Sequence, residues 1–279
     1  MKIALFYECG KIKEVGTGHK YRSREIGKEL IKRGHDIEYI EEDIVSTAWD
    51  ILVIDHIKKK KDMIMRAKQA GIKTVLIDGH KDDADLADLS VSAFLNRNAR
   101  YTGMKYIIVP RLNSWEYYSP YKKSNTVLVS MGGYDANNLA EFVLEILDEI
   151  KVNAIVTKSI NHGDFREKFS RVEIFEEDNY YTAMHECIMA ITNGGLTFFQ
   201  ALRYGMPTIP IAQYEHQNIN IDYLSHCCFP HEKDAKKLKI NIEWMMKNEY
   251  YRKSLSLLAT HFVDGKGTAR VCDLIECLI

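Results

Sequence analysis

The sequence predicts an α/β protein made of two successive Rossmann-like halves, each with a parallel sheet. Short apolar runs alternate with amphipathic stretches along the chain, a pattern typical of parallel sheets with helices on both faces. The pattern stops in the polar, aromatic stretch Ser114–Asn125 and restarts at Thr126. The length of 279 residues also suits two domains. We therefore expect an N-terminal domain over residues 1–120 and a C-terminal domain over residues 121–279, with a cleft between them.

In the first half, the strands are apolar runs that end at polar or glycine residues. They are expected at Lys2–Tyr7, Asp36–Ile40, Asp50–Asp55 and Lys73–Asp78, with shorter strands near Leu89–Ala93 and Tyr106–Val109. Helices are expected over His19–Lys32 and Lys58–Ala70. A glycine shortly after each helix, Gly34 or Gly71, ends it.

The second half repeats this order. Its strands are expected at Thr126–Ser130, Ala154–Thr157, Val172–Phe175, Ile188–Thr192 and Thr208–Ile211. Helices are expected over Ala136–Ile150 and Leu196–Tyr204, and they dominate from Gln217 onward.

The composition favours a globular protein of the cytoplasm. Hydrophobic residues make up 46% and charged residues 28%, and the net charge is −1, which does not suggest a basic surface for nucleic acid. We see neither a signal peptide nor an apolar run long enough for stable membrane insertion. The six cysteines lack metal-ligand spacing, so we expect reduced, mostly buried thiols and no structural zinc. Only Cys9, beside a proposed active-site loop, is singled out for a test of reactivity.

The first glycine turn precedes the first long helix. Gly16, Thr17 and Gly18 lead into His19, where glycine lets the backbone approach a ligand and helix-start amides accept anionic oxygens. A histidine there can be a general base, and Arg22, three residues on, could pair with a phosphate or carboxylate. A tight turn with a capping histidine and an exposed structural arginine explain the same residues.

Two acidic–histidine groups close predicted strands. Asp55 and His56 follow one strand, and Asp78, Gly79 and His80 follow another. Because strand ends face the ligand site in open parallel sheets, both groups are candidates for sugar contacts. Each acid could instead cap the following helix or turn. For Asp78 the cap is the favoured interpretation.

Two further glycine turns also lie between a strand and a helix, as Ser130–Asp135 and Asn193–Thr197. Paired glycines and free helix-start amides suit a diphosphate, and Gln200 could reach a ribose diol. A plain strand-to-helix connection, with Asp135 as the helix N-cap, is the alternative for the earlier turn. We expect nucleotide or phosphate contacts from Gly132, Gly133, Asn193, Gly194, Gly195, Leu196, Thr197 and Gln200.

The stretch Glu215–Asn218 follows the last predicted strand. The amides of Gln217 and Asn218 can donate and accept hydrogen bonds, which suits sugar hydroxyls. Helix N-terminal capping is the competing explanation.

Taken together, these motifs resemble the GT-B superfamily of nucleotide-sugar enzymes. The segments Asn193–Pro207 and Glu215–Asn218 look like the donor-binding region of the peptidoglycan N-acetylglucosaminyltransferase. A closer resemblance is to the UDP-sugar hydrolase of the pseudaminic acid pathway and its spore-coat relatives. Its matching residues are Gly16, Gly18, His19, Arg22, Asp55, His56, Met131, Gly132, Gly133, Asp135, Asp264, Gly265, Lys266, Gly267 and Arg270.

The resemblance implies metal-independent hydrolysis of a UDP-linked acetamido-deoxy sugar for surface-glycan biosynthesis, with no cofactor. His19 would activate water, Gly194, Gly195 and Thr197 would hold the diphosphate, and UDP would leave. Sugar contacts would come from Gly16, Thr17, Gly18, Arg22, Asp55, His56, Gln217 and Asn218. Gln200 stands where the transferase relatives have a ribose-binding glutamate, and an uncharged amide should hold the diol less firmly.

Two alternatives stay open. A GT-B glycosyltransferase would use the same UDP-sugar donor with an acceptor. A single glycine, Gly18, directly precedes His19, and this favours the hydrolase, because the transferase relative has a double glycine before its histidine. A non-catalytic nucleotide-sugar binding subunit is the third hypothesis. Fold-level analogy does not decide among them.

Overall fold

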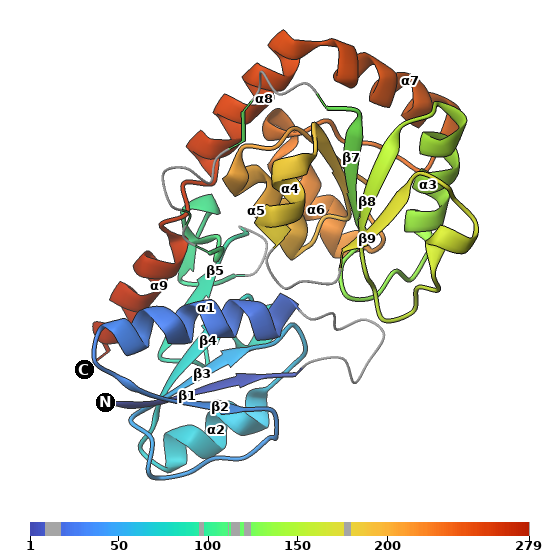
Figure 1. The fold of residues 1–279 in the computed structure, drawn as a ribbon. Coiled ribbons are helices and arrows are strands. Elements are labelled where there is room, and N and C mark those ends of the chain that lie inside the picture. Colours follow the sequence, from blue (N-terminus) through green and yellow to red (C-terminus); the bar gives the residue numbers. More distant parts are fainter. Residues whose placement is uncertain are drawn as a thin grey trace. The chain divides into compact units, whose positions relative to one another are not determined.

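The computed structural model describes residues 1–8, 18–94, 98–110, 112, 118–119, 124–175 and 180–278. The chain divides into two compact units, Met1–Arg111 with Asp264–Ile279, and Leu112–Val263. Each unit has a parallel sheet with helices on both faces (Figure 1). The predicted α/β class is therefore confirmed. Within the described ranges, no helix is long and apolar enough to cross a membrane.

The sheet of the first unit has the strand order β2-β1-β3-β4-β5-β6. Its strands are β1 (Lys2–Tyr7), β2 (Asp36–Ile40), β3 (Ile51–Asp55), β4 (Lys73–Ile77), β5 (Leu89–Ser92) and β6 (Tyr101–Thr102). Because side chains alternate along a strand, each strand contributes to two cores. Leu5 packs with helices α1 (Gly18–Lys32) and α9 (Gly267–Glu276), whereas Phe6 packs with α2 (Lys61–Gln69).

The sheet of the second unit has the order β11-β10-β7-β8-β9. Its strands are β7 (Thr126–Ser130), β8 (Asn153–Thr157), β9 (Val172–Phe175), β10 (Met189–Thr192) and β11 (Thr208–Pro210). The helices of this unit are α3 (Leu139–Glu149), α4 (Tyr180–Glu186), α5 (Leu196–Tyr204), α6 (Glu215–Tyr223), α7 (Ala235–Lys247) and α8 (Glu249–Phe262). Residues of α3 and α7 share one core with Val127 and Val129, and residues of α4 and α5 share another with Leu128. Short 3₁₀ helices complete the described elements: η1 (Lys81–Asp83), η3 (Met104–Tyr106), η4 (Phe165–Glu167) and η5 (Ser225–Cys227).

The strand predicted at Tyr106–Val109 is wrong. Its first residue ends η3, and the strand paired with β5 is β6. The run is apolar because α9 covers it: the Thr268 hydroxyl donates to the Val109 carbonyl at 3.2 Å, and Ile107 is buried. Burial by a helix and burial in a sheet leave the same apolar run in a sequence. Helix α4 was not predicted at all.

The C-terminal segment packs with the first unit, whereas the sequence-based division placed it in the second domain. Arg33 on α1 donates to Asp273 and Glu276 on α9, each at 2.7 Å. Arg270 holds Asp264 with two hydrogen bonds and also donates to the Lys105 carbonyl. The Asp264–Arg270 motif noted in the sequence therefore anchors α9 to the first unit.

Gly267 is required for this docking. A Cβ at this position would lie 2.0 Å from the Ile107 carbonyl oxygen and 2.9 Å from the Ile107 nitrogen. We expect Gly267→Ala to lower the free energy of unfolding by about 2–3 kcal/mol, because backbone atoms cannot yield as a flexible side chain can. Urea denaturation measures the change. Gly163→Ala is the matched control, since its Cβ would meet nothing within 4 Å. Equal unfolding midpoints for the two variants would contradict this explanation.

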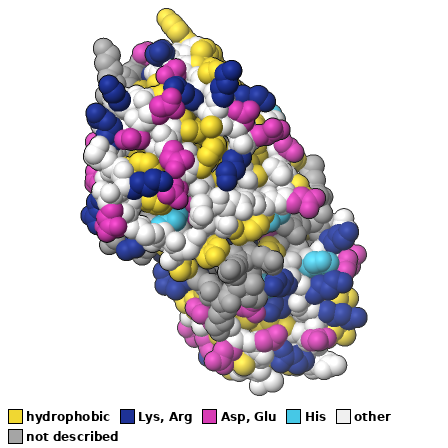
Figure 2. Space-filling model, turned by 90° about the vertical axis from the view of Figure 1, so that its right-hand side faces the viewer, with side chains coloured by type: hydrophobic (Ala, Val, Ile, Leu, Met, Phe, Trp, Pro, Cys, Tyr) yellow, Lys and Arg dark blue, Asp and Glu magenta, His cyan; other side chains and the backbone are white. Residues whose placement is uncertain are grey.

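The surface shown in Figure 2 mixes acidic and basic side chains without a large patch of one sign. Of the cysteines in the described residues, Cys187, Cys227, Cys228 and Cys272 are buried and Cys277 is exposed. Burial raises the pKa of the Cys227 thiol to about 12, so this thiol stays protonated near neutral pH. Cys9 lies outside the described residues.

Candidate active site

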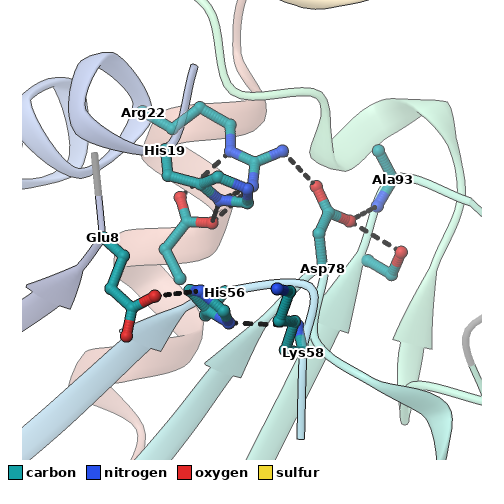
Figure 3. A network of polar contacts seen from close by, with 9 residues as sticks. Glu8, His19, Arg22, His56, Lys58, Asp78 and Ala93 are labelled. Atoms are coloured by element: carbon teal, nitrogen blue, oxygen red, sulfur yellow. Dashed lines mark hydrogen bonds and ion pairs between the residues drawn. The ribbon is translucent and has the colours of Figure 1, made fainter. Parts of the chain in front are cut away.

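The candidate catalytic group of the first unit lies where α1 begins and where β3 and β4 end. His19 and Arg22 come from the start of α1, and Asp78 directly follows β4 (Figure 3). Asp55 is the last residue of β3. Ligands of open parallel sheets bind at this edge. The predicted residues Gly16 and Thr17 lie outside the described residues, and Gly18 is the first residue of α1.

His19 and Asp55 form a buried pair. The Nδ1 atom of His19 lies 2.6 Å from an Asp55 carboxylate oxygen, and the Asp55 side chain is fully inaccessible to solvent. Arg22 Nη2 lies 3.0 Å from the same Nδ1 atom, but the Asp55 contact is shorter and two acceptors would repel each other at 2.6 Å. We therefore assign the proton to Nδ1, which donates it to Asp55. The Nε2 atom of His19 is then the proton acceptor, as a general base requires.

Arg22 is held between two carboxylates. Its Nε donates to Asp55 at 3.0 Å, its Nη1 donates to Asp78 at 2.7 Å, and its Nη2 also donates to Asp55. Burial alone would raise the pKa of Asp55, but the charges of Arg22 and His19 and their hydrogen bonds hold it below its usual value. Asp55 therefore stays ionised and keeps His19 oriented. The direct sugar contact expected of Arg22 stays a prediction, and the contacts of Arg22 favour a positioning role.

Asp78 does not cap the following turn, so the interpretation favoured from the sequence is wrong. Besides Arg22, it accepts hydrogen bonds from the Ser92 hydroxyl at 2.7 Å and the Ala93 amide at 3.1 Å. The cap of η1 is His80, whose ring accepts from the Asp82 amide. Asp78 has a φ of +46°, a strained conformation for a residue with a side chain. The only sequence signal for the pairing of Asp78 with Arg22 was that Asp78 follows the next predicted strand after the one that ends at Asp55.

His56 belongs to a second polar group with Glu8 and Lys60, two residues that the sequence analysis missed. The Lys58 amide donates to His56 Nδ1 at 3.0 Å, so the proton sits on Nε2, which donates to Glu8 at 2.9 Å. The Lys60 ammonium donates to the other Glu8 oxygen at 2.8 Å. Burial, followed by the charge of Lys60, lowers the pKa of His56, which keeps the ring neutral near pH 7.

The two groups lie side by side, because the rings of His19 and His56 stack with centroids 5.9 Å apart. The His56 side chain is only 1% exposed, and both of its nitrogens have partners. The sugar contacts expected of Asp55 and His56 stay predictions. Their burial favours supporting roles behind His19.

In the second unit, the two predicted glycine turns meet at the ends of the neighbouring strands β7 and β10. Asn193 joins them, because its side chain donates to the Met131 carbonyl at 2.7 Å and accepts from the Gly195 amide at 3.0 Å. Gly132 has a φ of +79°, and a Cβ there would lie 2.9 Å from the Asn193 amide nitrogen. Both features explain glycine at position 132.

Gln213, which the sequence analysis missed, holds the turn after β7 against the start of α6. Its side chain accepts from the Ala136 amide at 2.7 Å and donates to the Met131 carbonyl at 2.8 Å. The backbone amide of Gln213 donates to the Gln217 side-chain oxygen at 2.8 Å. Gln217 is thus left with its NH₂ group for a ligand, while the neighbouring Asn218 is exposed.

Gly194 and the start of α5 complete this edge. A Cβ on Gly194 would lie 2.7 Å from the Gln217 carbonyl oxygen, so only glycine fits. Among the described residues, no side chain caps α5 at Gly195, and Asn193 accepts only the Gly195 amide, which leaves the amides that follow Gly195 available to an anion. Thr197 and Gln200 are each 5% exposed. The side-chain amide oxygen of Gln200, Oε1, has no hydrogen-bond partner in the described part of the chain. Leaving it unpaired costs about 1–3 kcal/mol, which a hydrogen bond from a ligand hydroxyl would remove.

Asp135 organises the turn after β7. Its carboxylate accepts from the amides of Leu139 and Ala140 at 2.9 and 2.8 Å, and it contacts His162 at 3.1 Å. Burial alone would raise the pKa of Asp135, but these hydrogen bonds hold it below the value of 3.8. The sequence-based interpretation of Asp135 as a helix cap agrees with these contacts, although Asn138 is the residue directly before α3.

This depressed pKa predicts a loss of stability in acid. Because the folded pKa lies below the unfolded value, the contribution of Asp135 is present above pH 3.8 and is lost as pH falls through the folded pKa. We expect Asp135→Asn to lower the free energy of unfolding by about 1–2 kcal/mol at pH 6 and by less at pH 3. Urea midpoints at both pH values measure this, with the exposed Asp148→Asn as control. An equal loss at both pH values would contradict the role assigned to the charge.

In the described ranges, no group of three or more His, Cys, Asp or Glu side chains could hold a metal ion.

The chain is similar to known proteins at low sequence identity. No family model matches the chain. It is 25% identical over 276 residues to the spore coat polysaccharide biosynthesis protein SpsG of Bacillus subtilis, covering 86% of this chain and 80% of SpsG. It is 24% identical over 280 residues to an uncharacterized protein of Methanocaldococcus jannaschii, covering 78% of this chain but only 57% of that protein.

The solved structures agree with the GT-B resemblance. MurG of Acinetobacter baumannii matches with a TM-score of 0.70 and 14% identity over 99% of each chain. The glycotransferase of kitacinnamycin matches with a TM-score of 0.70 and 15% identity over 99% of this chain and 98% of its own. The chain therefore has the GT-B fold of glycosyltransferase structures.

Proposed function

We propose that this protein transfers a glycosyl group from a UDP-sugar to the hydroxyl of an acceptor. The observation that carries the proposal is the buried His19–Asp55 pair, which leaves His19 Nε2 as a base at the ligand-binding edge of a GT-B unit. The glycosyltransferase structures that share the fold favour this reading over the hydrolysis implied by the sequence motifs.

The second unit supplies the donor site. The free amides at the start of α5 neutralise the diphosphate, and the helix dipole adds partial positive charge there. Asn193 and Gln213 hold the two glycine turns that surround this point. The buried Gln200 oxygen accepts a hydrogen bond from a ribose hydroxyl. UDP rather than another nucleotide follows from the motif resemblance.

The first unit supplies the proton acceptor. His19 Nε2 takes the proton of the acceptor hydroxyl as its oxygen bonds to the anomeric carbon. The bond from that carbon to the phosphate oxygen breaks, and its electron pair leaves with UDP. Asp55 stabilises the imidazolium that forms, because its negative charge lies 2.6 Å away.

Hydrolysis is the second candidate, because the same base could act on water. The experiment measures UDP release from a panel of UDP-sugars with and without oligosaccharide acceptors, together with the thermal shift produced by UDP. We expect release that requires an acceptor and is lost in His19→Ala, while UDP still stabilises both proteins.

The other outcomes separate the alternatives. Rapid release without acceptor would replace transfer by hydrolysis. Binding of UDP without turnover under any condition would favour the non-catalytic binding subunit. Absence of any thermal shift with UDP would contradict the donor site itself.

A further inference from the structure

Glu8 is the carboxylate beside His19 that solvent reaches most easily. Its side chain is 24% exposed, whereas the side chain of Asp78 is 10% exposed and that of Asp55 is inaccessible. Glu8 directly follows β1, the strand that pairs with β3, so it shares the ligand-binding edge with Asp55.

Each Glu8 oxygen has one partner, the His56 ring on one and the Lys60 ammonium on the other. A carboxylate offers about four lone-pair directions, so each oxygen can accept a further hydrogen bond. Burial alone would raise the pKa of Glu8, but the hydrogen bonds of Lys60 and His56 and the charge of Lys60 hold it below its usual value. Glu8 is therefore an ionised acceptor near neutral pH.

The surrounding charges do not cancel. Three carboxylates, Glu8, Asp55 and Asp78, face two cations, Arg22 and Lys60, and the pair formed by His56 and Glu8 adds no cation because His56 is neutral. Arg22 already bonds both of the buried carboxylates. A further anion brought next to His19 would therefore meet an excess of negative charge. In the two polar groups, both described cations already pair with carboxylates.

We infer that Glu8 is a specificity-determining residue, which accepts a hydrogen bond from the transferred sugar and excludes sugars that carry a carboxylate. This inference rests on the proposed function and adds the class of sugar to it. A hydroxyl or amide N–H can donate to Glu8, whereas a carboxylate can only oppose it. His56 and Lys60 act through Glu8, because they fix its position and its ionisation.

UDP-glucose and UDP-glucuronate test this, because they differ only in a hydroxymethyl or carboxylate group on C5 of the ring. Dissociation constants are measured by calorimetry at low salt for the full-length protein and for Glu8→Gln. We expect the unaltered protein to bind the glucuronate at least about tenfold more weakly, and the glutamine variant to bind the two within about threefold of each other.

Two further variants sharpen the test. Lys60→Met removes the cation that offsets Glu8, so it should increase the discrimination, whereas the exposed control Glu42→Gln should leave it unchanged. UDP alone should bind the unaltered protein and Glu8→Gln equally. Thermal unfolding of each variant verifies that it is folded.

The results distinguish this inference from the proposed function. Equal affinity of the unaltered protein for the two UDP-sugars would overturn the role of Glu8, and so would a preference that Glu8→Gln leaves intact. In both cases UDP would still bind, and the donor site would stand. Failure of UDP itself to bind would instead overturn the proposed function.

Discussion

Asp55→Asn is expected to lower kcat by about 10³–10⁴-fold while the affinity for UDP stays nearly constant. An asparagine at this position can turn its NH₂ group toward His19 Nδ1, only 2.6 Å from the present carboxylate oxygen. That hydrogen bond stabilises the tautomer with the proton on Nε2, and this tautomer cannot accept a proton from the acceptor. The imidazolium also loses the negative charge that stabilises it.

Kinetics and calorimetry together measure this effect. Arg22 keeps its bond to Asp78 in the variant, so we expect it to fold with a lowered melting temperature. The exposed Asp82→Asn, which lies outside the His19 group, serves as the control for loss of a carboxylate. A decrease in kcat of less than about tenfold would mean that Asp55 does not orient the base.

Gly195→Asp is expected to weaken UDP binding by at least about 30-fold relative to Gly195→Asn. The two side chains have nearly the same size, and both meet Asn193 in the same way, since a Cβ at this position lies 2.9 Å from its side-chain oxygen. Both can also cap α5, which has no side-chain cap in the natural sequence. The two variants differ in charge and in the NH₂ donor that only asparagine carries, so the salt dependence of the difference is needed to isolate the charge.

Salt gives a second readout of the same pair. A fixed carboxylate at the start of α5 repels the diphosphate less as ionic strength rises, because the screening length falls below about 10 Å. The difference in UDP affinity between the two variants should therefore shrink between 0.05 and 0.5 M salt. Equal UDP affinities for the two variants at low salt would place the diphosphate somewhere else.

The sheets and the glycine turns could be predicted because their signals are local. Buried parallel strands read as apolar runs, and a turn that needs close backbone approach reads as glycine, as Gly132 and Gly194 show. The pairing of His19 with Asp55 was not predicted, although both residues were candidates, because 36 residues separate them and only the fold brings them together.

Other parts of the site have no local signal. Glu8 and Lys60 resemble ordinary charged residues until β1 and the segment before α2 are placed side by side. Gln213 is a lone amide whose function depends on the turn after β7, which lies far earlier in the chain, as its bond to Met131 across 82 residues shows. The docking of α9 depends on Gly267, which lies against Ile107, and on Arg33, which bonds Asp273. Nothing in the sequence around either residue shows which residue it contacts.

A crystal structure with UDP bound would show where the diphosphate lies. We expect it against the amides at the start of α5, within about 3 Å of hydrogen-bond donors between Gly194 and Thr197, with a ribose hydroxyl on the Gln200 side-chain oxygen. A diphosphate bound away from these amides, with the Gln200 oxygen still lacking a partner, would contradict this expectation.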